Sequence, residues 1–354
     1  MDYASINRII FQKRCYFITK DYLYKVNGFI KNINTSKKDM SITIKRYNGE
    51  QKNEWDTFIK NAKNATFLFE RDYMDYHADR FTDCSFMFYK ENSLAAVLPA
   101  SIDKSGKTIQ SHGGLTYGGL VMSRDTRSCD VIEIFTLTAE FIKYELKAER
   151  LHYKPLPYIY CSQPSDEPLY ALFKMNATLL ARTISTTIET RDCNTPSQLR
   201  MRGAKKAIKA GIKCCESSDF DRFWKVLTST LKTQHNCTPV HTAEEIIRLS
   251  RLFPKNIKLF TAMNEEKIVA GTVVYHTGHV AHLQYIAASP EGKKCGALDA
   301  LILYIMQDVY KDTRYIDFGI STENAGQVLN RGLIQQKEGF GGRAIVYDTY
   351  EIKV

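Results

Sequence analysis

The 354-residue sequence carries a formal net charge of +10, with 44% hydrophobic and 25% charged residues. These values are typical of a soluble globular chain long enough for two domains, and they argue against intrinsic disorder. The positive charge is concentrated in residues 1–39 and 199–213, and the remaining chain is close to neutral. The sequence therefore lacks the extended basic face of a nucleic-acid-binding protein, and DNA is not an expected partner.

The location of the protein is predicted from absent features of the sequence. No apolar run approaches the length of a transmembrane helix, and the N-terminus does not resemble a secretory signal. The nine cysteines are scattered without a CxxC pair, which indicates reduced thiols and no zinc site. We expect a cytoplasmic protein without a bound metal.

Residues 1–39 are interpreted as an N-terminal extension. They are rich in lysine and aromatic residues without a clear period, and they end in "NTSKKD" just before Met40. The next stretch, "MSITIKRYNGEQKNEWDTFI", has the pattern of a strand followed by an amphipathic helix. Met40 is therefore an alternative start to Met1, and the first domain is predicted to begin at residue 40.

One pattern of elements then occurs twice. Two strand-like runs joined by a glycine turn are followed by a helix and a closing strand, which predicts two α/β (α+β) domains of similar plan, over 40–190 and 191–354. The two hairpins are predicted at 93–112 and 267–288. The helices are predicted at 128–148 and 296–310, and the closing strands at 151–155 and 315–320. The paired turns are Ser105-Gly106 and Thr277-Gly278.

A basic helix is predicted between the two copies. Thr195-Pro196 is a helix start signal and Ala210-Gly211 a stop signal. Four basic side chains fall on one face of this helix. They are Arg202, Lys205, Lys206 and Lys209. This face either attracts an anionic ligand or is simply solvated.

These strings resemble the FemAB-type family of tandem GNAT acyltransferases. The basic helix "RMRGAKKAIKAGI" is similar to the Fem segment R-x-x-x-K-A-x-K-x-G-V, and "YIDFGISTENAGQVLNRGLIQQKEGFGGR" at 315–343 is similar to the D-F-G … G-L … F-K-x-x-F-G-G ending of these proteins. The strings "FLFERDYMDYHADRF" and "SHGGLTYGGL" support the match. The resemblance implies two GNAT-like domains with mixed, splayed sheets. It also implies that the last strands of the second domain can return to the first.

The resemblance implies an N-acyltransferase that uses acyl-coenzyme A as co-substrate. The acceptor is expected to be an anionic small molecule, an amino-sugar nucleotide or a lipid-linked sugar, in surface polysaccharide synthesis. Aminoacyl-tRNA-dependent transfer to a peptidoglycan precursor is one alternative. A catalytically inactive GNAT-like binding module is another, because the turn at 289–298 departs from the family's Q/R-x-x-G-x-G/A spacing by placing Leu298 where glycine or alanine belongs.

Candidate site residues fall into three groups. Transfer to an amine needs a proton acceptor, and the candidates are Asp317, His282 and Glu338; alternatively, Asp317 caps the following loop and His282 is an ordinary strand histidine. The GNAT pyrophosphate turn maps to Gly292, Lys293, Lys294, Gly296 and Ala297. The acceptor is expected to contact Arg71, His77, Arg80, His112, Tyr117, Arg202, Lys206 and Lys209. The alternative for the two arginines of the first domain is pairing with Asp72, Asp79 and Asp83.

Overall fold

A computed structural model describes residues 42–192 and 194–354. The predicted extension over 1–39, together with Met40 as a start, lies outside the described residues. Residues 44–354 form one compact unit. Below, residues 44–190 are called the first half and residues 191–354 the second half.

The first half alternates short strands with helices. Its strands are β1 (Ile42–Arg46), β2 (Thr82–Asp83), β3 (Phe86–Lys90), β4 (Ser93–Leu98), β5 (Ser101–Ile102), β6 (Thr108–Gln110), β7 (Val121–Met122), β8 (Arg150–Tyr153) and β9 (Thr178–Glu189). Its α-helices are α2 (Lys52–Asn61), α3 (Arg71–Met74), α4 (Ser128–Tyr144) and α5 (Glu167–Lys174). Three 3-10 turns complete it: η1 (Phe67–Phe69), η2 (Asp75–His77) and η3 (Tyr158–Tyr160).

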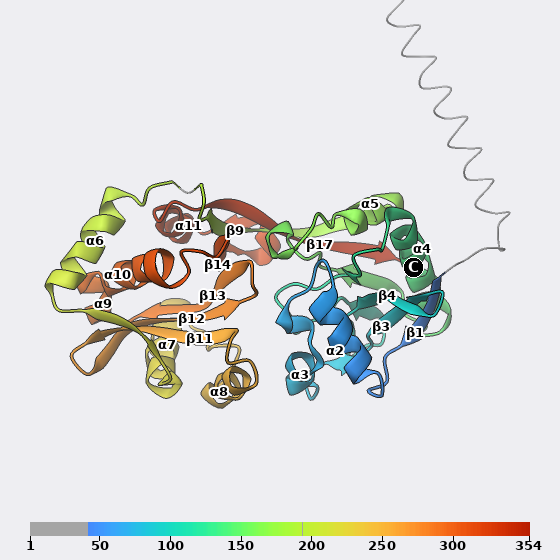
Figure 1. Cartoon of the computed structure of the whole chain (residues 1–354), viewed down its shortest axis with the longest axis horizontal. Helices are drawn as coiled ribbons and strands as arrows, with labels where there is room; N and C mark the ends of the chain where they lie inside the picture. Colours follow the sequence, from blue (N-terminus) through green and yellow to red (C-terminus); the bar gives the residue numbers. More distant parts are fainter. Residues whose placement is uncertain (1–41, 193) are drawn as a thin grey trace, which may run out of the picture. The chain divides into compact units, whose positions relative to one another are not determined.

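The second half has longer strands. They are β10 (Lys213–Ser217), β11 (Ile257–Asn264), β12 (Lys267–His276), β13 (Val280–Ala288), β14 (Tyr315–Ile320), β15 (Thr322–Glu323), β16 (Val328–Leu329) and β17 (Arg343–Lys353). Its helices are α6 (Gln198–Lys209), α7 (Phe220–His235), α8 (Ala243–Leu252), α9 (Pro290–Cys295), α10 (Ala297–Tyr304), the π-helical η4 (Ile305–Val309), η5 (Asn324–Gly326) and α11 (Arg331–Glu338). In Figure 1, α6, α9 and α10 cover one face of β11, β12 and β13, and α7 and α8 cover the other.

The predicted helices and the predicted hairpin over 267–288 are present with shifted ends. The hairpin predicted over 93–112 is divided, because β4 pairs with β3 and β7 and only the short β5 pairs with β6. Strands β12 and β13 form the predicted hairpin over 267–288, and α4 begins at the predicted residue but ends at Tyr144. The helix predicted over 296–310 is divided into α10 and η4. Helix α4 begins with a capping box in which Asp130 accepts from the backbone N–H of Arg127, and Ile134 and Ile142 are buried below it. No helix of the described chain is long and apolar enough to cross a membrane.

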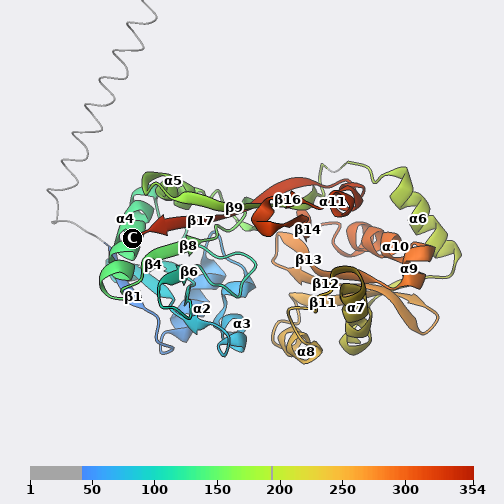
Figure 2. The same cartoon turned by 180° about the vertical axis from the view of Figure 1, so that it is seen from behind.

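One mixed sheet runs through both halves. Its eleven strands follow the order β10-β11-β12-β13-β14-β9-β17-β8-β6-β5-β2, beside a four-stranded sheet β1-β3-β4-β7. The two expected domains therefore do not have separate sheets. Strand β17 pairs with β9 and, over Tyr350–Lys353, with β8 of the first half, so the last strand of the second half does return to the first. Figure 2 shows β17 alongside β9 and β8 from behind.

The two halves also share an aromatic core. The ring of Phe67 lies 5.3 Å from that of Phe253 and 5.6 Å from that of Tyr275, measured between ring centroids. Tyr73 packs edge-on against the same two rings. Because buried aromatic pairs contribute large apolar areas, this cluster stabilises the contact between the halves.

Candidate functional site

A cavity opens where β13 and β14 separate. The two strands pair in parallel only from Val280 opposite Tyr315 to His282 opposite Asp317. Beyond that point β14 pairs with β9 alone, and a cavity of about 460 Å³ forms beside it. It is lined by Thr116, Tyr117, Lys154, Pro155, Thr183, His282, Leu283, Gln284, Phe318, Gly319, Ile320, Tyr347, Asp348 and Thr349. We call this space the junction cavity.

A β-bulge in β13 turns three consecutive residues toward this cavity. In the β12–β13 register Val273 lies opposite Tyr285 and Val274 opposite Leu283, so Gln284 is the extra residue. Simple alternation predicts His282 and Gln284 on one face and Leu283 on the other. The bulge breaks this alternation, and all three line the cavity.

Asp317 lies at the centre of a buried hydrogen-bond network. The residue is 0% exposed, and its Oδ2 accepts from His282 Nδ1 at 2.7 Å. Five further donors contact the carboxylate, from four hydroxyl groups and one backbone N–H. They are Ser185 Oγ, Thr187 Oγ1 at 2.9 Å, Tyr347 OH at 2.8 Å, Tyr160 OH at 3.1 Å and the Gly319 N–H at 3.4 Å. With its oxygens enclosed, Asp317 cannot contact an acceptor directly.

This network fixes the orientation of the His282 ring and determines which of its nitrogens carries the hydrogen. Burial alone would raise the pKa of the Asp317 carboxyl, but the hydrogen bond and charge of His282, together with hydroxyl donors, hold that pKa at about 2. Since an ionised carboxylate only accepts, His282 Nδ1 carries the hydrogen. In the neutral ring the other nitrogen, Nε2, is then the basic one. Of the three predicted proton acceptors, His282 is thus the one that lines the cavity.

Two tyrosines of this network are absent from the sequence prediction. Tyr160 comes from η3 of the first half and Tyr347 from β17, and their hydroxyl oxygens lie 3.0 Å apart. Both hydroxyls reach Asp317, so the site is completed by elements far apart in the sequence. No local pattern marks either residue. The only available signal was the expected return of the last strands to the first domain.

The predicted pyrophosphate turn is a helix. Residues Pro290–Cys295 form α9, capped by Ser289, whose Oγ accepts from the Gly292 N–H at 3.1 Å. A Cβ at Gly292 would overlap the carbonyl oxygen of Val269, and one at Gly296 would overlap the carbonyl oxygen of Gly203. These glycines are therefore needed for packing of α9 on β12 and of α10 on α6. Gly292, Lys293 and Gly296 also line a cavity of about 530 Å³, so their expected contact with the donor stays a prediction.

Replacing Gly292 with alanine is expected to lower the free energy of unfolding by about 1–3 kcal/mol, because the new methyl group overlaps backbone that cannot rotate away. Urea denaturation of the variant and the wild type measures this. The matched control is Gly332→Ala in α11, where the nearest atom would be Asn330 Oδ1 at 3.9 Å and stability should not fall. Equal losses for the two variants would contradict the packing role.

Two further cavities extend from the junction cavity toward α9. One of about 180 Å³ shares Phe318 with it and lies against α11. The larger one, of about 530 Å³, is lined in part by Arg200 and shares Lys293, Leu298 and Gln336 with the 180 Å³ cavity. Arg200 is bound to Asp299 at 2.6 Å, whereas Lys293 has no ion pair within the described chain. The three cavities thus follow one another from α6 to His282.

Lys337 is a buried lysine that the sequence prediction missed. Its Nζ donates to the carbonyl oxygens of Gly319 and Ile320, both at 2.8 Å, and it lines the 180 Å³ cavity. Burial lowers the pKa of Lys337 to about 8, against a smaller opposing effect of Asp317. The ammonium group holds the irregular end of β14 in place. From the "KEGFGG" string the sequence predicted Glu338 as a site residue, but Glu338 lines none of the three cavities.

The stability of the protein is expected to depend on this lysine above pH 8. The folded chain binds fewer protons than the unfolded chain between about pH 8 and 10.5, so the free energy of unfolding should rise with pH in that window relative to Lys337→Met. The expected gain is about 1.4 kcal/mol per unit of pKa difference, with no change below pH 8. Urea denaturation at several pH values measures it. Lys174→Met, at an exposed lysine, is the control, and a flat difference for Lys337→Met would contradict the expectation.

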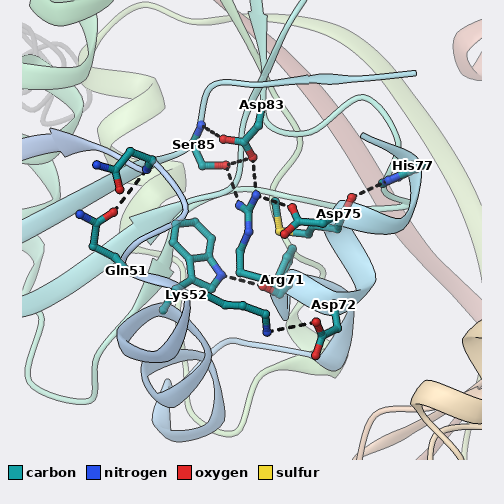
Figure 3. Close-up of polar contacts among 12 residues, drawn as sticks. Gln51, Lys52, Arg71, Asp72, Asp75, His77, Asp83 and Ser85 are labelled. Carbon is teal, nitrogen blue, oxygen red and sulfur yellow. Dashed lines mark hydrogen bonds and ion pairs between the residues drawn. The ribbon is translucent and has the colours of Figure 1, made fainter. Parts of the chain in front are cut away.

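Arg71 is a buried structural residue rather than an acceptor contact. Its side chain is 2% exposed, and Nη2 lies 2.5 Å from Asp75 Oδ1 and 2.9 Å from Asp83 Oδ2. Figure 3 shows the guanidinium between these two carboxylates and Ser85. The same group stacks on the ring of Tyr47 at 3.9 Å. The predicted acceptor contact is therefore replaced by an internal ion-pair cluster.

Arg80, His77 and His112 also bind other parts of the chain. Arg80 Nη2 contacts Glu245 Oε1 of the second half at 2.7 Å. His77 Nδ1 is 2.6 Å from the Met74 carbonyl oxygen, and its ring stacks on that of His112. His112 is only 2% exposed, and burial lowers its pKa to about 3. It is therefore a neutral interior residue. None of the three lines the junction cavity.

The glycine-rich loop "SHGGLTYGG" folds around one lysine. Ser111 Oγ accepts from the Lys154 N–H at 2.7 Å, the Leu115 carbonyl accepts from Lys154 Nζ at 3.2 Å, and the Gly118 N–H donates to the Lys154 carbonyl at 3.3 Å. Tyr117 of this loop lines the junction cavity and donates to Thr66 Oγ1 at 3.2 Å. Of the predicted acceptor residues in the first half, Tyr117 is thus the one that reaches this cavity.

The basic face of α6 is exposed. Arg202 donates to the Gln198 carbonyl, Lys206 Nζ donates to the Lys294 carbonyl at 2.8 Å, and Lys209 is exposed without an ion pair in the described chain. These side chains lie near α9, whereas the junction cavity is lined by other elements. The face therefore lies toward α9 and lines none of the three cavities. Within residues 42–192 and 194–354, no three His, Cys, Asp or Glu side chains are grouped as a metal site.

Comparison with known proteins agrees with this geometry. Residues 199–325 match the family model described as an acetyltransferase (GNAT) domain. Comparison with curated protein sequences gives no match. Among solved structures, FemX matches with a TM-score of 0.62 at 10% identity, over 88% of this chain and 97% of that one.

Two other solved structures share the fold. L-PGS from Bacillus licheniformis matches with a TM-score of 0.55 at 12% identity, over 89% of this chain and 93% of that one. The C-terminal domain of a putative lysylphosphatidylglycerol synthetase from Agrobacterium fabrum matches with a TM-score of 0.50 at 11% identity, over 73% and 80% of the two chains. Residues 199–325 are thus similar to a GNAT acetyltransferase domain, and the solved structures show that the fold is shared beyond those residues. In fold, the chain is a FemAB-like tandem GNAT protein, as the sequence predicted.

Proposed function

We propose that this protein is a cytoplasmic N-acyltransferase. It would move an acyl group from acyl-coenzyme A to an amino group of a sugar nucleotide or a lipid-linked sugar in surface polysaccharide synthesis. The observation that supports this is the His282–Asp317 pair, at the point where β13 and β14 separate and at the wall of a cavity. A base oriented by a buried carboxylate suits deprotonation of an amine.

The residues present fit a phosphate-bearing thioester donor. Lys293 lines both the 530 Å³ and the 180 Å³ cavities, and its charge has no carboxylate partner in the described chain. The smaller cavity is lined largely by apolar residues, including Ile286, Ile302 and Phe318. A coenzyme with a charged end at Lys293 and a thioester near Phe318 would follow the order of the three cavities.

The chemistry then needs only groups that the chain supplies. His282 Nε2 accepts a proton from the acceptor ammonium in the junction cavity, and the neutral amine attacks the thioester carbonyl carbon. A C–N bond forms and the C–S bond breaks, and the remaining extra proton of the nitrogen passes to the departing sulfur, so that coenzyme A leaves as the thiol. Because β13 no longer pairs with β14 beyond His282, backbone N–H groups on that side are free to donate to the oxyanion.

A second candidate donor is aminoacyl-tRNA. The exposed basic face of α6 lies near α9 at the donor end of the cavities, where a nucleic-acid phosphate could bind. The resemblance to Fem-type proteins implies the same donor. This alternative keeps the site and changes only the acyl carrier.

Thermal unfolding of the full chain with acetyl-coenzyme A, free coenzyme A and uncharged tRNA tests the proposal. A ligand that binds only the folded state raises the unfolding temperature with its concentration. Stabilisation by the coenzymes, reduced in Lys293→Gln but not in Lys311→Gln at an exposed loop lysine, supports acyl-coenzyme A. Stabilisation by tRNA alone favours the second donor, and stabilisation by none favours an inactive binding module.

A further inference from the structure

Lys154 stands out among the residues of the junction cavity. It is the single lysine or arginine in the set of described residues that line this space. It lies in the segment after β8, and His282 of β13 lines the same cavity. The group that would deprotonate the acceptor and a fixed positive charge therefore share one cavity.

The charge of Lys154 has no acidic partner within the described chain. Its Nζ donates only to the Leu115 carbonyl oxygen, at 3.2 Å, and partial burial lowers the pKa of the ammonium group below its ordinary value. A buried charge without a counter-charge is costly, and proteins usually retain one where a ligand supplies the partner.

The carboxylates close to the cavity are already engaged. Asp348 lines it, but its two oxygens are held by Arg182 Nε and Nη2, both at 2.8 Å, and Tyr350 OH donates to one of them. Asp317 is enclosed by its own donors, as described above. Neither is free to neutralise Lys154.

The glycine-rich loop also holds this lysine in place. Backbone and side-chain groups of Ser111, Leu115 and Gly118 each bind Lys154. A Cβ at Gly118 would overlap the Ser111 carbonyl oxygen, so this tight fold requires glycine there. The loop therefore contributes to the cavity in two ways, with Tyr117 at the cavity wall and by holding Lys154.

We propose that Lys154 binds an anionic group, a carboxylate or a phosphate, on the acceptor molecule while the amine of that molecule faces His282. This inference rests on the proposed function for the identity of the acceptor. It moves anion recognition from Arg71 and Arg80 to the junction cavity. The acceptor class it defines is an amine that carries a negative charge within the span of one cavity.

Calorimetric titration of the full chain with three amino sugars tests this without any acyl donor. The probes are glucosamine, which has no anionic group, glucosamine 6-phosphate and 2-amino-2-deoxyglucuronic acid. At least one anionic probe should bind the wild type about tenfold more tightly than glucosamine, as expected for one charge-assisted hydrogen bond. The phosphate and carboxylate arms distinguish the two kinds of anion.

The variants decide whether Lys154 is responsible. Lys154→Met should remove the preference for the anionic probe, and Lys174→Met, at an exposed lysine of α5, should keep it. Thr116→Glu, at an exposed position lining the cavity, should abolish the preference while leaving the contacts of Lys154 intact, so the test stands even where Lys154→Met fails to fold.

Equal binding of the three probes to the wild type, absence of binding by both anionic probes, or a preference that survives in Thr116→Glu would overturn the inference. A chain that shows the preference but releases no coenzyme A thiol from acetyl-coenzyme A would instead contradict the proposed function. The two failures are therefore distinguishable.

Discussion

Replacing His282 with glutamine is expected to lower kcat/KM for acyl transfer by about 10²–10⁴-fold, because glutamine keeps a polar side chain at the site but supplies no basic nitrogen. The measurement is release of free coenzyme A thiol from acetyl-coenzyme A in the presence of glucosamine 6-phosphate. Coenzyme binding, measured by the rise in unfolding temperature, should change little, since His282 lines neither of the two cavities that Lys293 lines.

The matched control is His279→Gln, at the exposed turn between β12 and β13 and only three residues away. Its rate should remain within a factor of two or so of the wild type, as expected for a surface substitution. A similar loss in both variants would point to damage of the hairpin. An active His282→Gln variant would remove the histidine from the proposed mechanism.

Replacing Arg71 with methionine is expected to destabilise the first half by about 3 kcal/mol, with no direct effect on acceptor binding. Removing one partner of a buried ion pair leaves the other charges uncompensated, and values of about 3–5 kcal/mol are typical. Asp75 and Asp83 are 46% and 29% exposed, which places the expected loss at the lower end. Urea denaturation measures it.

Arg80→Met provides the comparison, because Arg80 pairs with Glu245 near the surface, with side chains 37% and 27% exposed. Such pairs contribute about 0–1 kcal/mol. A weakened affinity for glucosamine 6-phosphate in Arg71→Met at unchanged stability would restore the acceptor contact expected from sequence.

The sequence was informative where local pattern determines structure. The glycine turn at Thr277-Gly278 and the apolar periods predicted the second hairpin and the long helices, and the strand "YIDFGI" predicted where Asp317 would lie. His282 and Asp317 meet because two parallel strands end their pairing at those two residues. Alternation along β13 failed at Gln284, since a single extra residue in the strand reverses the facing of its neighbours and leaves little trace in the pattern.

The donor and acceptor predictions show where local pattern is insufficient. A glycine required for close helix packing, such as Gly292, has the same sequence signature as one required for phosphate binding. Arg71 pairs with Asp83, as the stated alternative had it, and with Asp75 one helical turn away, a local partner that the sequence analysis did not consider. No sequence pattern marked Lys154 or Tyr160, because the role of each depends on contacts with residues distant in the sequence.

The position of β17 in the shared sheet has a consequence for biosynthesis. Residues 343–353 are the last element of the described chain, yet β8 and β9 of the first half both require them as a hydrogen-bonding neighbour. While the ribosome is still translating the second half, those two edges have no partner and are open to pairing with other nascent chains. The first half therefore completes its folding only after β17 has been synthesised.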